Sequence, residues 1–141
     1  MVTRPTIRPI ALAVIRRDED LLVFEGRDPV KQQTFYRPLG GGIEFGETAE
    51  FALHRELREE LAVELEEVRL LQVVENIFQY QDAPGHEIVF LHTATVADPA
   101  FYDRDDLGTV LDSGSRVLWL PIKDVIDGKA ILYPEALVNL V

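Results

Sequence analysis

The chain has 141 residues, which is enough for one domain with a hydrophobic core of its own. Hydrophobic residues make up 47% of the sequence, so we expect the domain to fold without a partner. The formal net charge of −11 argues against binding to a polyanion through a basic surface. Because the chain has no cysteine, disulfides, thiolate metal sites and cysteine nucleophiles are excluded.

Neither membrane-spanning nor secretory signals are present in the sequence. No apolar run approaches the roughly 18 residues of a membrane span, and residues 1–10 lack the apolar centre of a signal peptide. We therefore expect one cytoplasmic domain over residues 1–141, with neither a membrane nor a nucleic-acid polymer as partner. A homodimer is left open.

Short β-rich runs occur before and after one amphipathic segment, a pattern that indicates a layered α/β domain with a mixed sheet. Polar composition predicts loops at residues 31–35 and 98–115, and Pro84-Gly85 predicts the turn of a hairpin. The other expected elements are strands at 10–15, 21–25, 36–39, 43–45, 68–80, 87–96 and 117–120, a glycine loop at 40–42, a helix from Thr48 to about residue 61, a helical turn at 122–126 and a helix at 135–140.

The most informative stretch runs from Gly41 to Val63, GGIEFGETAEFALHRELREELAV. Its glycines can bring backbone close to a ligand. Thr48 suits the N-cap of the following helix, and Glu47 beside it suits the positive end of the helix dipole. Leucines at 53, 57 and 61 form an apolar stripe that would dock the helix on the core.

Three carboxylates of this helix, Glu56, Glu59 and Glu60, fall on one arc of its surface at about 100° per residue. Like charges repel, but a hard divalent cation among them makes the cluster favourable, and Mg2+ is held by a few carboxylates, water and phosphate oxygens. The alternative is an ordinary solvated acidic helix. The glycines and Glu47 upstream favour the metal site.

These residues resemble the Nudix box, G-x5-E-x7-R-E-U-x-E-E-x-G-U with U aliphatic, from Gly41 to Val63. One position departs, because Ala62 replaces the last glycine of the box. That glycine normally supplies a left-handed helix end, which costs an alanine about 1 kcal/mol or more, unless the helix ends differently. The resemblance implies an α/β/α sandwich with a mixed sheet and a pyrophosphohydrolase that depends on Mg2+ or Mn2+.

The resemblance also implies roles for single residues. Glu56, Glu59 and Glu60 would bind the metal with a backbone carbonyl of Gly40 or Gly41, and Glu56 or Glu59 would orient or deprotonate water. Arg55, the arginine of the box, would pair with Glu47 and hold the loop against the helix. A further acid often lies in a loop before the last strand, and Asp106 and Asp112 are the candidates here; an acidic surface loop is the alternative.

On the substrate side, Arg27 follows the second strand, where several members of the family place a phosphate-binding arginine; a solvated arginine is equally consistent with the sequence. Tyr36, Phe78 and Tyr80 could stack on a base, although most aromatic residues on strands belong to the core. Tyr80 lies 17 residues beyond the box, a position that goes with dinucleoside polyphosphate hydrolases in this family.

The sequence therefore predicts hydrolysis of a phosphoanhydride bond in a nucleoside diphosphate linked to another group. Nucleoside triphosphates, including oxidised ones, and dinucleoside polyphosphates are the rival substrates. The isomerase branch of the fold needs a cysteine that this chain lacks. A non-catalytic domain that senses a nucleotide is the main alternative function, and a structural or interaction domain is a further one.

Overall fold

The computed structural model describes residues 5–141, so the first four residues of the expected signal-free N-terminus lie outside it. The strands of residues 5–141 form two four-stranded sheets that share their hydrophobic core clusters. The first has the strand order β5-β1-β7-β6 and is mixed, because β1 runs parallel to β7 while the other pairs are antiparallel. The second contains β2, β3, β4 and β8. The elements are β1 (Arg8–Val14), β2 (Arg16–Arg17), β3 (Asp20–Asp28), β4 (Gln33–Arg37), β5 (Leu39–Gly42), α1 (Ala49–Leu61), β6 (Leu65–Tyr80), β7 (Ala83–Val96), a 3-10 helix (Pro99–Asp103), β8 (Val117–Pro121), α2 (Ile122–Ile126) and a second 3-10 helix (Glu135–Asn139).

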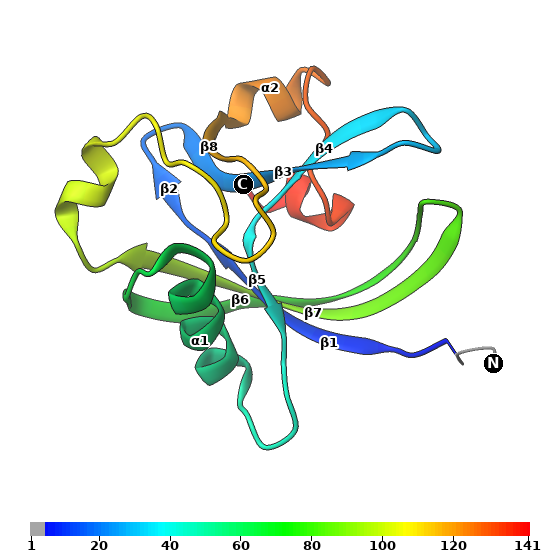
Figure 1. Ribbon diagram of the computed structural model, residues 1–141, viewed down its shortest axis with the longest axis horizontal. Helices are drawn as coiled ribbons and strands as arrows, with labels where there is room; N and C mark the ends of the chain where they lie inside the picture. Colours follow the sequence, from blue (N-terminus) through cyan, green and yellow to red (C-terminus); the bar gives the residue numbers. More distant parts are fainter. Residues whose placement is uncertain (1–4) are drawn as a thin grey trace.

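Helices cover both sides of this pair of sheets. Figure 1 shows α1 at the lower left, beside β5, with α2 and the C-terminal 3-10 helix on the opposite side. The expected α/β class, mixed sheet and central helix are confirmed. The predicted helix at 135–140 is wrong in type, because these residues form a 3-10 helix.

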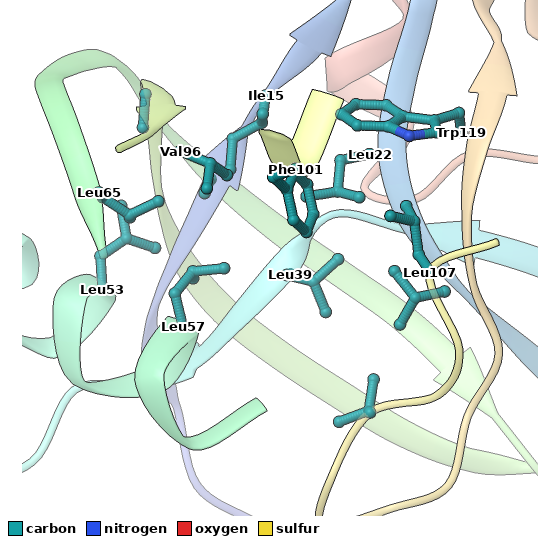
Figure 2. Packing of buried hydrophobic residues seen from close by; sticks show 14 of the residues in the cluster. Ile15, Leu22, Leu39, Leu53, Leu57, Leu65, Val96, Phe101, Leu107 and Trp119 are labelled. Atoms are coloured by element: carbon teal, nitrogen blue, oxygen red, sulfur yellow. The ribbon is translucent and has the colours of Figure 1, made fainter. Parts of the chain in front are cut away.

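The two hydrophobic clusters of the core lie on the two faces of the mixed sheet. One contains Leu53 and Leu57 of α1, both fully buried, and extends across the sheet to the aromatic rings of Phe101 and Trp119 (Figure 2). The other contains the alternate residues of β1, β3 and β7, among them Leu12, Val23 and Leu91. Burial of whole aliphatic side chains contributes about 1.5–3 kcal/mol each, so both faces anchor the fold.

The turn of the long β6–β7 hairpin differs from the prediction. It consists of Gln81 and Asp82, both with positive φ (50° and 65°), whereas Pro84 and Gly85 lie inside β7. A two-residue turn with two positive φ angles matches the twist of the flanking strands. Gly85 pairs with Phe78, whose ring occupies the space that a side chain at Gly85 would need.

Strand pairing overrides local composition in two segments predicted as loops. The glycines at 40–42 form part of β5 and pair with β1, and residues 43–45 are irregular. The polar residues 33–35 belong to β4, which pairs with β3. The loop predicted at 98–115 contains a 3-10 helix that Asp98 caps.

Candidate active site

Local sequence signals determine both ends of α1. The Thr48 side chain accepts a hydrogen bond from the Phe51 backbone N–H at 3.1 Å, as an N-cap does. At the other end, Ala62 has φ 55° and ψ 39°, and its N–H donates to the Arg58 carbonyl at 2.9 Å. This chain therefore keeps the left-handed helix end although it lacks the glycine that usually adopts it.

Arg55 connects the helix to the loop before it. Its guanidinium donates to both Glu47 carboxylate oxygens, at 2.7 and 2.8 Å, and to the Gly42 carbonyl at 2.9 Å. It also donates to Glu56 at 3.0 Å and to Glu59 at 3.3 Å. The hydrogen bonds from Arg55 hold the pKa of Glu47 well below its usual range, at about 2, and those to the carboxylates raise the pKa of Arg55. The expected contact between Arg55 and Glu47 is present.

The acids of the helix lie in different environments. Glu60 is buried, and burial, together with the charge of Glu56, raises its pKa to about 8, against the hydrogen bond that it accepts from the Gly40 N–H at 3.0 Å. Burial also raises the pKa of Glu56, against the Arg55 guanidinium. Glu59 is half exposed. Two acids are therefore kept out of water, and their negative charges oppose each other.

The shared arc of carboxylates lies against the β5 glycines. The Cβ atom that an alanine would carry at Gly41 would lie 2.6 Å from the Glu56 Cδ, so only glycine leaves room for this carboxylate. Within residues 5–141, no three acidic or histidine side chains converge closely enough to hold one metal ion together. Arg55 holds two of the acids instead. Their oxygens and the nearby backbone carbonyls are hard donors of the kind that Mg2+ and Mn2+ take.

Of the two candidates for a further acid, one lies near the carboxylates of α1. The charge of Asp112 contributes to the raised pKa values of Glu56 and Glu60, and the N–H of the preceding residue, Leu111, donates to the Glu60 carbonyl at 2.9 Å. Asp106 instead accepts from the Gly108 N–H in its own loop at 3.0 Å. The structure thus brings Asp112 towards the helix and leaves Asp106 apart.

A cavity of about 480 Å3 lies between the β3–β4 and β6–β7 hairpins, which extend in the same direction in Figure 1. Aromatic side chains line it, including the predicted Phe78 and Tyr80, and also Phe35 and Tyr133. The Phe35 ring meets the Tyr80 ring edge to face, with 5.9 Å between centroids. The volume and the aromatic walls suit a flat organic group such as a nucleobase.

Hydrogen bonds connect the tips of the two hairpins. Asp28, 1% exposed, accepts hydrogen bonds from the backbone N–H groups of Val30, Lys31 and Gln81, the first and last at 3.0 Å. These bonds, that of Gln81 first, lower the pKa of Asp28. The Tyr80 hydroxyl donates to the Arg27 carbonyl at 3.3 Å. The ring of Tyr80 is therefore oriented by the opposite hairpin.

An ion pair also lines the aromatic cavity. Glu87 of β7, 5% exposed, accepts from Arg37 of β4 at 2.6 Å and from the Asn76 amide at 3.3 Å. Both partners line the cavity. A buried ion pair with a second donor gives this cavity fixed polar groups beside its aromatic walls.

The remaining predicted substrate residues do not line this cavity. The Arg27 side chain is exposed and donates to Thr34 at 3.3 Å, and Tyr36 is half-buried against the core cluster that contains Leu12 and Val23. The pair formed by Arg37 and Glu87 could not be predicted from the sequence, because the two residues are 50 positions apart and carry no spacing signal.

Comparison with known proteins gives concordant results. A family model described as NUDIX domain matches residues 6–137. The NAD-capped RNA hydrolase NudC of Chromobacterium violaceum is 31% identical over 114 residues. That match covers 78% of this chain but only 38% of the relative's length.

Solved structures of similar fold include a NUDIX hydrolase from Nitrosomonas europaea, with a TM-score of 0.68, 20% identity and coverage of 95% of this chain and 85% of the other. A NUDIX-family hydrolase from Clostridium perfringens has a TM-score of 0.65 with 15% identity, covering 96% and 93%. The MutT NUDIX hydrolase of Burkholderia pseudomallei has a TM-score of 0.61 with 24% identity, covering 84% and 85%. Over the residues that the structure describes, no helix has the length and apolarity to cross a membrane.

Proposed function

This chain belongs to the Nudix family, and we propose that it is a divalent-cation-dependent hydrolase that cleaves a phosphoanhydride bond in a nucleoside diphosphate linked to another group. The observation that carries the proposal is the placement of Glu56 and Glu60 of α1 against the β5 glycines. A second cavity, of about 410 Å3, is lined by Glu56 and Gly42. The phosphate groups would bind there, with the nucleoside in the aromatic cavity.

The residues that would hold a cation are Glu56, Glu59 and Glu60, with the Gly41 carbonyl. A bound divalent cation would neutralise phosphate charge and lower the pKa of a water nucleophile. Arg55 now donates hydrogen bonds to Glu56 and Glu59, and a bound cation would replace it at these two carboxylates. The hydrogen bonds from Arg55 to Glu47 and Gly42 would remain, so the loop and the helix would keep their relative position.

Glu56 and Glu59 are the two candidates for the group that accepts the proton of the attacking water. Glu56 is mostly buried and has a raised pKa, whereas Glu59 is half exposed. A partly desolvated carboxylate is the stronger base. The Gln variant of the residue that also acts as the base should lose more kcat, for an equal loss of stabilisation by Mg2+, than the Gln variant of a residue that is only a ligand.

The substrate class follows from the aromatic cavity and from the relatives. NAD-type dinucleotides are candidate substrates because the Chromobacterium violaceum relative is an NAD-capped RNA hydrolase. Dinucleoside polyphosphates are candidates because of the position of Tyr80, which lines the aromatic cavity. Nucleoside triphosphates remain in the set. We expect substrates whose diphosphate carries a nucleoside on at least one side.

A nucleotide-binding domain without hydrolysis is the second candidate function, because Arg55 already pairs with Glu56 and Glu59. The deciding experiment is a substrate panel with ADP-ribose, NAD+, NADH, diadenosine tetraphosphate, GTP, dGTP, 8-oxo-dGTP and a short NAD-capped RNA, each with Mg2+, with Mn2+ and with excess EDTA. Hydrolysis that needs the cation supports the proposal. Tight binding without turnover in all three conditions would favour the sensor.

A further inference from the structure

Arg8, the first residue of β1, lies between the two cavities. It lines the aromatic cavity together with Asn76 and Glu87, and it lines the second cavity together with Gly42 and Glu56. It is a side chain common to both. Any ligand that has a nucleoside in the first cavity and a phosphate group in the second must therefore pass Arg8.

Strand register places Arg8 in a row of polar side chains across the mixed sheet. Asn76 of β6 is paired with Glu87 of β7, and Glu87 is paired with Arg8 of β1. Paired residues of neighbouring strands present their side chains on the same face. Beyond Arg8, the row reaches β5, where a Cβ atom at Gly42 would lie 3.2 Å from the Arg8 Nη2. The glycine thus leaves space for the guanidinium.

Arg8 offers its positive charge to an anionic ligand, while the carboxylates of the second cavity oppose one. In the part of the chain that the structure describes, no salt bridge engages its guanidinium, whereas Arg37 and Arg55 are paired with carboxylates. Its own neighbours in the second cavity include Glu44 and Glu56. An arginine that is free of internal partners, exposed to solvent and adjacent to an aromatic cavity has its N–H donors available for phosphate oxygens.

We propose that Arg8 binds the phosphate group that joins the nucleoside to the part of the substrate held at α1, and so sets the register of the phosphate chain. This inference rests on the proposed function for its ligand class. A guanidinium can take two oxygens of one phosphate or one oxygen of each of two phosphates. Because it contacts only the phosphate, Arg8 would favour the binding of nucleotides over that of nucleosides.

The test is equilibrium binding in EDTA, so that neither hydrolysis nor a metal contributes. The probes are ADP and GDP, with adenosine and guanosine as their uncharged counterparts, and the proteins are the wild type, Arg8→Gln, Arg8→Lys and Arg69→Gln. Arg69 lies on β6, is exposed and lines neither cavity, so its substitution removes one positive charge elsewhere.

In the wild type, the diphosphates should bind more tightly than the nucleosides. Arg8→Gln should weaken diphosphate binding by about ten- to a hundredfold, the range for losing charge-assisted hydrogen bonds, and leave nucleoside binding unchanged. Arg8→Lys should recover part of the loss, and Arg69→Gln should resemble the wild type. If Arg8→Gln weakened the binding of nucleosides and of diphosphates equally, Arg8 would only shape the cavity. If Arg69→Gln weakened diphosphate binding as much as Arg8→Gln, the net charge of the protein alone would explain the effect. Either result overturns the proposal.

The binding test and the substrate panel test the role of Arg8 and the hydrolase function separately. If the panel finds no hydrolysis but Arg8→Gln removes the preference for diphosphates, the phosphate-binding role stands and the hydrolase proposal falls. If hydrolysis occurs and Arg8→Gln leaves diphosphate binding and KM unchanged, the hydrolase stands and the role of Arg8 falls. Melting curves of the variants establish that each one is folded.

Discussion

Replacement of Ala62 by glycine should stabilise the protein. Ala62 ends α1 in the left-handed conformation, with φ 55° and ψ 39°, and its methyl group is exposed, so removal of this group sacrifices no packing. The left-handed conformation costs an ordinary residue roughly 1–2 kcal/mol, because Cβ crowds the carbonyl. Glycine escapes that cost but gains about 0.4–1 kcal/mol of conformational freedom in the unfolded chain.

The difference predicts a gain of about 0.5–1 kcal/mol in the free energy of unfolding for Ala62→Gly. For a chain of this length, 1 kcal/mol corresponds to about 3 °C in Tm, so the expected rise is about 2–3 °C. Calorimetry or thermal circular dichroism in EDTA measures it. The matched control is Ala52→Gly, the same chemical change inside α1, which should lower the stability by about 1 kcal/mol or more.

A Tm that falls or stays constant in Ala62→Gly, while Ala52→Gly behaves as expected, would show that Ala62 carries no conformational strain. The helix end would then not be held in the left-handed conformation in solution. A rise in both variants would point to an effect of glycine on the unfolded state that the conformational argument does not contain.

Three further predictions concern the box and the aromatic cavity. Glu47→Gln should lower the stability at pH 7, because the pKa of this carboxylate is held at about 2 in the folded protein, against about 4.5 in the unfolded chain. The stabilisation by Glu47 is therefore present above about pH 4.5 and is lost as the pH falls towards 2, so the difference in Tm between variant and wild type should disappear over that range. A constant difference in Tm would contradict the ion pair with Arg55. Gly41→Ala should reduce kcat by up to about a hundredfold, since the new Cβ would displace the Glu56 carboxylate; unchanged kinetics in a folded variant would remove the steric argument. Tyr80→Ala should raise KM about tenfold with a smaller effect on kcat, as expected for loss of stacking that is worth roughly 1–3 kcal/mol; an unaltered KM for the best substrate would exclude a stacking role.

The sequence predicted the helix of the site well, because its signals are local. The side chain of Thr48 caps α1, the helix ends at Leu61, and Leu53 and Leu57 are buried as their spacing indicates. Each of these features depends on residues within two turns of each other, which is the range over which caps and hydrophobic periodicity act. The contact between Glu47 and Arg55, eight residues apart, spans about the same range.

Features that depend on strand pairing were not predictable in this way. The hairpin turn at Gln81 and Asp82 has positive φ angles at residues that are not glycine or asparagine, and Pro84-Gly85 gave a stronger but misleading signal. The aromatic cavity is formed by residues from five strands and the C-terminal segment, and its ion pair joins Arg37 to Glu87 across the two sheets. No spacing in the sequence encodes such contacts, because the sheet brings them together only after the strands have paired.

Titration of Mn2+ into the metal-free protein shows whether the carboxylates of α1 hold a divalent cation. Calorimetry at constant ionic strength should detect binding to the wild type, and Glu60→Gln should weaken that binding by at least about tenfold. Glu66→Gln, which removes an exposed carboxylate from β6, should bind Mn2+ as the wild type does. Equal Mn2+ affinities for the wild type and Glu60→Gln would contradict the account.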